Sequence, residues 1–411
     1  MICADAVVVG AGPAGSAAAI TLARAGRDVL LVDKARFPRD KCCGDGLTTG
    51  AVRWLERLGL RPQGVRSWTP VEDIWIRSPS GRVARYPLPR GHGSYGAVAR
   101  RVDLDAALVE EARRAGAEVR DGHSLVGVDT GGAGSWTIEL EVEGLGTVRT
   151  RYAIAADGMW SPLRKQAGLL EDHAYRGEWH AFRQYFTDVT GPAAEQLWVW
   201  FEPALLPGYA WSFPLPGGAA NVGFGVRRGP GFRGSVMARL WPEVLALPHV
   251  RELLGPHARP AAPHRAWPIP ARLARSALAG AGGRVLLAGD AARASDPMTG
   301  EGIAQALETG ALAARAILAA GALAPRRAAC LYQRAVSSGL ALDNRLAGAL
   351  SRVLRTPLGA RGAVRATSAN EWVAGHFARW LYEDYPRALL ATPWRWRHGA
   401  LEREGAWAAA P

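Results

Sequence analysis

ADAVVVGAGPAGSAAAITLARAGRDVLLVDKA, residues 4–35 of this 411-residue chain, is the segment most informative about the architecture. Its two apolar runs, glycine-rich turn and alanine-rich middle predict a strand, a turn, a helix and a second strand. Gly10, Gly12 and Gly15 have the spacing G-x-G-x-x-G. The first glycine permits a tight turn, the second lets the backbone approach a pyrophosphate, and the third allows close packing of helix on strand. The stretch therefore predicts a Rossmann-like dinucleotide-binding unit, with the phosphates at the helix N-terminus.

An acidic residue completes this unit. Asp33 ends the second strand, about 20 residues beyond the glycines, where a carboxylate can hold ribose hydroxyls. The cofactor contacts expected from this stretch are Gly10, Gly12, Pro13, Ala14, Gly15, Asp33 and Lys34.

Two later strands also end in a carboxylate. RYAIAADGMWSPLRKQAG, residues 151–168, reaches Asp157, and GGRVLLAGDAARASDPMTGEGIAQALETGALAA, residues 282–314, reaches Asp290. Such a carboxylate, followed by small residues and a helix N-terminus, can hold ribityl hydroxyls while backbone N–H groups face the N1/O2 edge of a flavin. The cofactor contacts expected here are Asp157, Gly158, Gly289, Asp290, Pro297, Gly300, Gly302 and Ile303.

These separated pieces resemble a known flavoprotein fold. ARRVDLDAAL, residues 99–108, adds Arg101 four residues before Asp105. With the three strand-end motifs in this order, the chain resembles the FAD-binding fold of para-hydroxybenzoate hydroxylase and its relatives over residues 1–330. The resemblance implies FAD as the cofactor and Arg101 as one of its contacts, with Arg100 left open as an alternative.

Three further segments resemble the geranylgeranyl reductase family: PRDKCCGDGLTTGAV at 38–52, PGYAWSFPLPGGAANVGFG at 207–225 and DPMTGEGI at 296–303. Cys43 matches the motif cysteine of that family, which implies a position near flavin and substrate, with Gly44 beside the cofactor. Cys42 stands where close bacterial relatives tend to have proline, so it is given no role. A buried structural thiol remains the alternative for Cys43.

The aromatic strand of the second segment predicts a substrate wall. Tyr209, Trp211 and Phe213 alternate along it and therefore share one face. An isoprenoid chain is uncharged and methyl-branched, so a tunnel for it needs such apolar and aromatic walls. Gly217 suits the turn that follows, and we expect it beside the substrate with the three aromatics. An aromatic core strand beneath the flavin unit is the alternative.

The resemblance implies hydrogenation of an isoprenoid C=C bond, which needs a hydride and a proton. Reduced flavin delivers the hydride from N5, and protonation toward a tertiary carbocation assists, with Tyr209 and Trp211 stabilising the charge. We therefore predict Cys43, Tyr209 and Trp211 as the catalytic residues. Candidate proton donors are Cys43, Tyr209, a flavin-bound water and the region of His92. The reductant stays open between transient NADPH, a ferredoxin and another reductase protein.

Composition and charge limit the kinds of partner and compartment to expect. The formal net charge is +13, but 47 of the 50 basic residues are arginines spread along the chain, so we expect no nucleic-acid partner. The four cysteines have neither a disulfide pattern nor metal-ligand spacing, which favours a reducing cytoplasm and no metal. No uninterrupted apolar run approaches the roughly 18 residues of a membrane span.

We expect an α/β fold in which a Rossmann-like FAD-binding domain is interleaved with an antiparallel-sheet substrate domain. The FAD-binding domain comprises 1–70, 96–172 and 272–330, the substrate domain 71–95 and 173–271, and a helical region 331–411. The helical region mixes tryptophan with arginine. That mixture fits either a cap on the substrate tunnel or peripheral contact with the inner face of a membrane.

Two other functions compete with the reductase interpretation. One is a flavin-dependent monooxygenase or halogenase that acts on an aromatic or terpenoid metabolite. It would use the same fold, but its reduced flavin would react with oxygen in place of donating a hydride to carbon. GYAWSFP is similar to the Gly-Trp-x-Trp-x-Ile-Pro stretch of flavin halogenases, but Tyr209 replaces the first Trp and Phe213 the Ile. A non-catalytic prenyl-binding protein is the third class, against which the intact FAD motifs argue.

Overall fold

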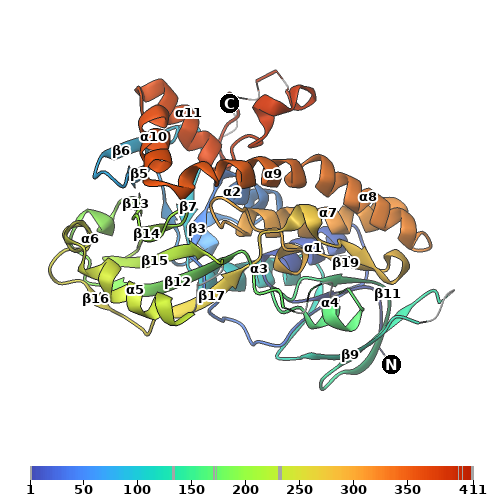
Figure 1. Cartoon of the computed structure of the whole chain (residues 1–411). Coiled ribbons are helices and arrows are strands. Elements are labelled where there is room, and N and C mark those ends of the chain that lie inside the picture. The colour runs from blue at the N-terminus through green and yellow to red at the C-terminus, as the bar shows by residue number, and fades with distance from the viewer. Residues whose placement is uncertain are drawn as a thin grey trace.

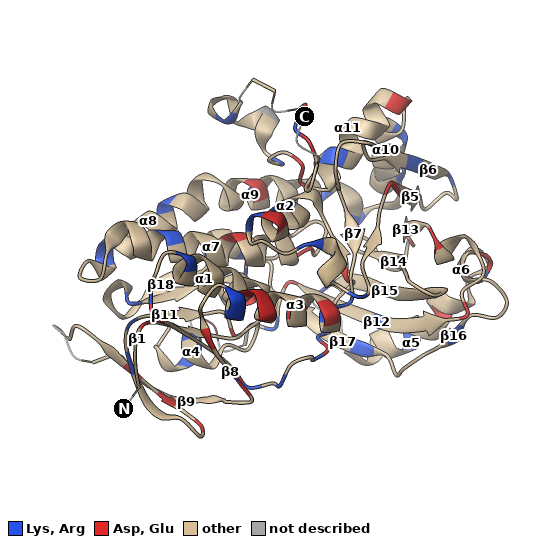
Figure 2. Cartoon of the chain, turned by 180° about the vertical axis from the view of Figure 1, so that it is seen from behind, with Lys and Arg blue, Asp and Glu red and all other residues tan. Residues whose placement is uncertain are grey.

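The computed structural model describes residues 2–131, 135–169, 172, 174–229, 234–396, 398–399 and 401–408. Two sheet-based units lie side by side, and helices of the C-terminal region run along one side of both (Figure 1). The predicted fold class is confirmed: a Rossmann-like α/β unit is interleaved with a largely antiparallel sheet, and helices follow. Seen from behind, Lys and Arg are interspersed with Asp and Glu along the ribbon (Figure 2).

The first sheet places the predicted cofactor motifs at one edge. Its strand order is β18-β19-β11-β1-β2-β8, and β10 and β9 continue it beside β11. The strands are β1 (Ile2–Val9), β2 (Val29–Asp33), β8 (Glu118–Asp121), β9 (Leu125–Asp129), β10 (Ile138–Val142), β11 (Gly146–Ala155), β18 (Ala279–Gly280) and β19 (Val285–Leu287). Because β1 is parallel to β2 and β11, and β11 to β19, the loops that follow these strands meet at their carboxyl ends.

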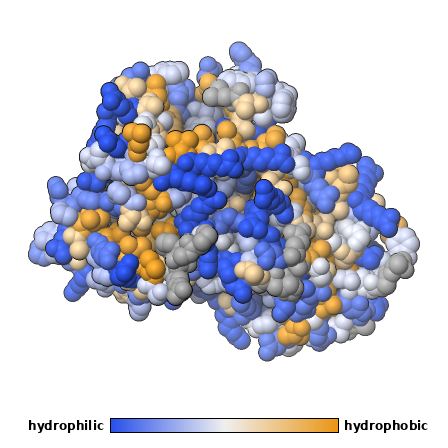
Figure 3. All heavy atoms as spheres, in the orientation of Figure 1, coloured by the Kyte–Doolittle hydropathy of each residue, from blue (hydrophilic) through white to orange (hydrophobic). Residues whose placement is uncertain are grey.

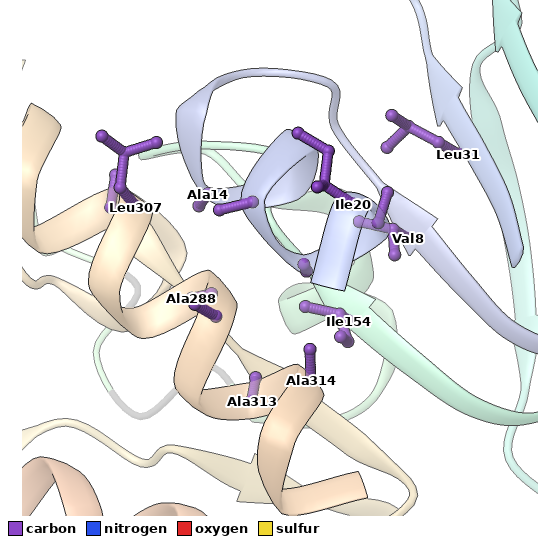
Figure 4. Packing of buried hydrophobic residues seen from close by; sticks show 14 of the residues in the cluster. Val8, Ala14, Ile20, Leu31, Ile154, Ala288, Leu307, Ala313 and Ala314 are labelled. Atoms are coloured by element: carbon purple, nitrogen blue, oxygen red, sulfur yellow. The ribbon is translucent and has the colours of Figure 1, made fainter. Parts of the chain in front are cut away.

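Alanine-rich helices cover this sheet closely. They are α1 (Pro13–Arg24), α3 (Arg101–Arg114), α7 (Ile303–Ala320) and α8 (Pro325–Ser338), with α2 (Thr49–Arg57) and the short α4 (Pro162–Gln166). A Cβ at Gly310 of α7 would lie 2.0 Å from the carbonyl oxygen of Ala14, so only glycine permits this crossing of α7 over α1. Figure 4 shows side chains of α1 and α7 meeting Val8 and Ile154 of the sheet in one apolar core.

Among the described residues, one helix is long and apolar enough to span a membrane, α7. Two thirds of it (67%) is buried inside the protein, where it packs on α1, α2 and α8. Its hydrophobicity is therefore explained by its place in the core.

The second sheet has strand order β16-β12-β15-β14-β13-β5-β6, with β17 beside β12. Its strands are β5 (Asp73–Arg77), β6 (Val83–Pro87), β12 (Trp179–Thr187), β13 (Leu197–Trp200), β14 (Tyr209–Leu215), β15 (Ala219–Arg227), β16 (Arg259–Pro260) and β17 (Arg265–Ile269). α5 (Gly234–Ala246) and α6 (Pro248–Leu254) cover one face. α10 (Pro357–Thr367) and α11 (Glu371–Leu381) cover the other, which carries Trp211 and Phe213.

The remaining elements join these units. β3 (Gly46–Leu47), β4 (Thr69–Pro70) and β7 (Ala97–Val98) form a small sheet, and α9 (Leu340–Leu350) follows α8. Short 3-10 helices occupy Pro62–Gly64, Pro192–Ala194, Leu273–Arg275, Ala281–Gly283, Gly289–Ala292, Val353–Arg355, Leu389–Ala391 and Pro393–Arg395.

The C-terminal region is less separate than the sequence predicts. The expected boundary at 330 falls inside α8, whose Tyr332 donates its hydroxyl to the carbonyl oxygen of Leu287 at 2.6 Å. The tail also returns to earlier segments, where Ala406 pairs with Ser94 and the Trp407 ring meets the Trp68 ring edge-on. Helix α8 therefore packs on the first unit across the expected boundary at 330.

Candidate active site

A cavity of about 450 Å³ lies where the carboxyl ends of the first sheet face the aromatic strand of the second. The structure brings most of the predicted residues to its wall. Those lining it are Gly10, Gly12, Pro13, Ala14, Asp33, Lys34, Cys43, Gly44, Arg101, Asp157, Gly158, Tyr209, Trp211, Phe213, Gly289, Asp290, Gly300, Gly302 and Ile303. We call this space the flavin cavity.

Four other predicted residues lie elsewhere. Gly15 is beneath the cavity, where a Cβ would lie 1.7 Å from the carbonyl oxygen of Gly10, so its role is helix packing. Pro297 lies outside the lining, and its carbonyl oxygen accepts the indole N–H of Trp179. Gly217 has φ +74° in the β14–β15 turn, with no atom within 4 Å of an added Cβ, and His92 is in an exposed loop. The predicted ligand contacts of Pro297, Gly217 and His92 are not met by this geometry.

The start of α1 has room and charge for a pyrophosphate. Gly12 precedes the helix, and no side chain caps its first N–H groups. A Cβ at Gly12 would have as its nearest atoms the guanidinium ends of Arg39, at 3.6 Å, and Arg101, at 3.9 Å. Both arginines donate to the carboxylate of Asp105. Arg39 forms one hydrogen bond with it, and Arg101 forms two, of 2.8 and 2.7 Å. Arg39 was not predicted, and Arg100 lies over the Tyr185 ring instead of in the cavity lining.

The three strand-end carboxylates differ in what they already bind. Asp33 accepts the backbone N–H groups of Ala11 at 2.7 Å and Ala35 at 2.8 Å, and Asp290 pairs with Lys41 at 3.0 Å. Asp157 uses one oxygen to accept a backbone N–H, while Oδ1 is buried without a hydrogen-bond partner among the described residues. Burial raises the pKa of Asp157 to about 6. An orphaned acceptor beside an uncapped helix start fits a hydroxyl-rich phosphorylated ligand such as FAD.

The motif cysteine is a protonated thiol. Cys43 lies between the flavin cavity and the first core, and its Sγ accepts the backbone N–H of Asp45 at 3.3 Å. Burial raises its pKa to about 11, although the charge of Arg101 opposes this. Cys42 instead points its thiol toward the carbonyl oxygen of Arg265 at 3.6 Å. At neutral pH Cys43 is thus a weak donor and not a thiolate nucleophile.

A buried network fixes the cysteine loop to the aromatic strand. The amide of Asn221 on β15 donates to the carbonyl oxygen of Cys43 and to Asp45, both at 2.8 Å. Its oxygen accepts the indole N–H of Trp211 at 3.1 Å, and the Tyr185 hydroxyl also donates to Asp45 at 2.7 Å. Asn221 lies in the 207–225 segment, in the run Asn-Val-Gly. The sequence singled out that segment but did not predict that Asn221 links the cysteine loop to the aromatic strand.

We expect Asn221→Ala to lower the free energy of unfolding by about 2–3 kcal/mol, because it leaves the buried donor of Trp211 and part of Asp45 unsatisfied. Denaturant unfolding followed by tryptophan fluorescence measures the loss. The matched control is Asn344→Ala, since Asn344 is also buried but its Oδ1 has no partner among the described residues. Equal losses in the two variants would contradict the positioning role.

A second cavity, of about 640 Å³, lies between the second sheet and the C-terminal helices. We call it the apolar cavity. Its sheet side is formed by Ile74, Ile76, Leu197, Val199 and Phe201, and its helix side by Val364, Phe377, Trp380, Leu381 and Tyr382. Gly46, Tyr209, Phe213, Met298, Thr299 and Glu301 line both cavities. The aromatic strand β14 therefore lies at the junction of the two cavities and contributes side chains to both.

Comparison with known proteins agrees with this geometry. The family described as FAD binding domain matches residues 3–322. A menaquinone reductase of Mycolicibacterium smegmatis is 35% identical, over 95% of this chain and 97% of its own. A digeranylgeranylglycerophospholipid reductase of Methanopyrus kandleri is 34% identical, over 75% of this chain and 79% of its own.

Two solved structures share the fold. A geranylgeranyl bacteriochlorophyll reductase-like protein of Thermoplasma acidophilum has a TM-score of 0.77 at 21% identity, covering 96% of this chain and 99% of its own. The flavin-dependent halogenase CmlS has a TM-score of 0.64 at 23% identity, covering 83% of this chain and 63% of its own.

Fold and site together define an FAD-dependent oxidoreductase. More narrowly, the chain belongs to the geranylgeranyl reductase family.

Proposed function

We propose that this protein hydrogenates C=C bonds of an isoprenoid chain carried by a quinone or a glycerolipid. The observation that supports this most strongly is the apolar cavity, which adjoins the flavin cavity and shares Tyr209 and Phe213 with it. Its volume of about 640 Å³ and its apolar lining suit a hydrocarbon chain. Relatives named for menaquinone and digeranylgeranylglycerophospholipid reduction support the substrate class.

The residues around the junction would position an alkene. FAD, when reduced, supplies a hydride at this position. Trp211 and Phe213, whose ring centres are 6.1 Å apart, exclude water and offer aromatic faces to a developing tertiary cation. Tyr209 donates its hydroxyl to the carbonyl oxygen of Thr299, and burial raises its pKa. Tyr209 is therefore proposed to orient the chain and to stabilise charge, as Trp211 does, while Cys43 limits the space beside the flavin.

Oxygen chemistry is the competing use of the same fold. The test is to mix reduced holoprotein with oxygen in the presence of a prenylated quinone. A reductase is expected to release hydrogen peroxide and leave the quinone without added oxygen. A product with a new C–O bond, or a halogenated product when halide is present, would favour the monooxygenase or halogenase alternative.

The reductant is proposed to be NADPH, bound transiently, or a protein donor such as a ferredoxin or another reductase. Anaerobic bleaching of the flavin absorbance by each donor separates the two. Bleaching by NADPH alone supports the nucleotide, whereas bleaching only with reduced ferredoxin supports a protein partner.

We also propose that the protein works in the cytoplasm at the inner membrane face. Large apolar side chains are exposed around the C-terminal helices: Leu358 is 77% exposed, Trp372 71% and Trp394 73%. Trp372 also lines the apolar cavity. Figure 3 shows hydrophobic atoms on the surface of this part of the molecule.

Charge supports an anionic bilayer as the occupant of this surface. In residues 331–411, the exposed arginines that form no ion pair with a described residue are Arg334, Arg345, Arg352, Arg355, Arg361, Arg365 and Arg403. Arginine beside exposed tryptophan and leucine suits the anionic interface of a membrane.

We expect the double variant Trp372→Ala/Trp394→Ala to bind anionic vesicles at least about tenfold more weakly, because two aromatic side chains lose interfacial burial. Vesicle co-sedimentation measures the binding. Trp136→Ala is the control, since Trp136 is 68% exposed beside β10, in the unit away from the C-terminal helices. Unchanged binding of the double variant, or an equal loss in the control, would contradict the proposed surface.

A further inference from the structure

We propose that Glu301 is the acid that protonates the alkene. The inference rests on the proposed hydrogenation and names the proton donor for it. Glu301 follows Gly300 in the loop before α7 and lines both the flavin cavity and the apolar cavity. Its side chain therefore lies where the two cavities adjoin, within reach of an alkene placed there.

The carboxyl group is held at the junction. A Cβ placed on Gly46 would lie 3.6 Å from Oε1 of Glu301 and 3.0 Å from Cε2 of Phe213, so the carboxyl group and the Phe213 ring flank the same point. The backbone of Glu301 is fixed as well. Its carbonyl oxygen accepts the N–H of Asp296 at 2.7 Å, and its own N–H donates to the Thr299 hydroxyl at 3.3 Å.

The side chain of Glu301 has no hydrogen-bond or ion-pair partner among the described residues. The nearby cation, Arg387, is engaged elsewhere, with Asp296 at 3.1 Å and Glu383 at 3.4 Å. Glu383 is satisfied in turn by Thr48 at 2.9 Å and Gln305 at 2.6 Å. The cluster thus keeps its charges paired while leaving the Glu301 carboxyl group free to face the cavities.

This setting keeps Glu301 protonated at neutral pH. Burial raises its pKa to about 8, and the charges of Glu383 and Asp296 add to the rise while Arg387 opposes it. The other ionisable groups that face it are the Cys43 thiol and the hydroxyls of Tyr209 and Tyr382. Burial raises the pKa of each of these above that of Glu301, so Glu301 is the strongest neutral acid at the junction.

The step balances in atoms and electrons. The π pair of the C=C bond takes the proton of Glu301, which forms one C–H bond and leaves a tertiary cation on the substrate and a carboxylate on Glu301. A hydride from the reduced flavin forms the second C–H bond, so the alkene gains two electrons and the flavin loses two. The Glu301 carboxylate then regains a proton from water before the next turnover.

The test compares Glu301→Gln with Glu308→Gln. Glu308 is a matched control, because burial raises its pKa to about 7 but it lines neither cavity. Each holoprotein is reduced chemically and mixed anaerobically with a prenylated quinone. We expect wild-type flavin oxidation to slow as pH rises through about 8, where Glu301 loses its proton. Glu301→Gln should be slower by about a hundredfold or more and lose that pH limb, and Glu308→Gln should stay within about twofold.

A second measurement does not depend on turnover. Infrared titration of oxidised holoprotein should show a protonated carboxyl band that disappears near pH 8 in wild type and in Glu308→Gln. Glu301→Gln should lack the component that disappears near pH 8 but keep the one that disappears near pH 7, which comes from Glu308. Glu301→Asp keeps an acid at this position and is expected to restore part of the rate, which an incidental packing role would not explain.

The outcomes separate the two proposals. If wild type reduces the substrate and Glu301→Gln matches its rate and pH profile, the assignment of Glu301 is overturned while the proposed function stands. If wild-type reduced flavin is not oxidised by any prenylated substrate, the proposed function itself is overturned.

Discussion

Gly12→Ala is expected to weaken FAD binding by about ten- to a hundredfold while leaving the protein folded. The backbone at Gly12 has φ −75°, which alanine adopts freely, and an added Cβ would meet only arginine ends at 3.6 and 3.9 Å. The structure therefore tolerates the methyl group, but the pyrophosphate must approach the same point. Loss of charge-assisted backbone hydrogen bonds, at about 1.5–3 kcal/mol each, accounts for the expected magnitude.

Two further glycines make this prediction specific. Gly15→Ala places a Cβ 1.7 Å from the carbonyl oxygen of Gly10, so it should lower both the melting temperature and FAD content. Gly64→Ala has no atom within 4 Å of the new Cβ and should change neither. FAD titration by fluorescence quenching and thermal unfolding of the apoprotein measure the two properties separately. Full FAD affinity in Gly12→Ala would place the pyrophosphate elsewhere.

Ala363→Trp is expected to abolish turnover of long-chain substrates while short prenyl substrates still react. Ala363 lines the apolar cavity from α10 and is partly exposed, so a larger side chain can fill the cavity without entering the main core. If the new side chain excludes one five-carbon isoprene unit from the cavity, substrate binding loses about 4 kcal/mol of hydrophobic burial. Binding of a chain that needs that space should therefore fall by several hundredfold.

Gly362→Trp is the matched control, since Gly362 is exposed on the same helix, lines neither cavity and has no atom within 4 Å of an added Cβ. Anaerobic flavin oxidation with quinones of increasing prenyl length gives the comparison. The cavity assignment fails if Ala363→Trp loses short and long substrates alike, or if both variants reduce the long substrate as wild type does.

Local sequence predicted which residues of the first sheet line the flavin cavity, because strand geometry alone brings them together. In a parallel sheet the carboxyl ends of the strands converge, so Gly10, Asp33 and Asp157 reach one edge whatever the rest of the chain does. The pattern of alternating aromatics on β14 likewise needs only strand geometry. Pro297 and Gly217 were predicted from their place in a motif, but neither lines a cavity among the described residues.

What could not be predicted depends on long-range packing. The apolar cavity exists because α10 and α11 close over the second sheet, which no local pattern specifies. Asn221 acts across 178 residues of sequence on Cys43. The pKa of Glu301 is raised first by burial, and the charge of Glu383, far along the chain, adds to the rise. Charge and burial at these positions are properties of the assembled fold.

The proposed function requires that an isoprenoid alkene is reduced at the junction of the two cavities. The most direct measurement is one anaerobic turnover of fully reduced holoprotein with a prenylated menaquinone, following flavin absorbance and product mass together. We expect flavin oxidation coupled to a mass gain of about two units per reduced bond, located in the side chain and not in the quinone ring. Flavin that stays reduced until oxygen enters, or a gain confined to the quinone ring, would contradict it.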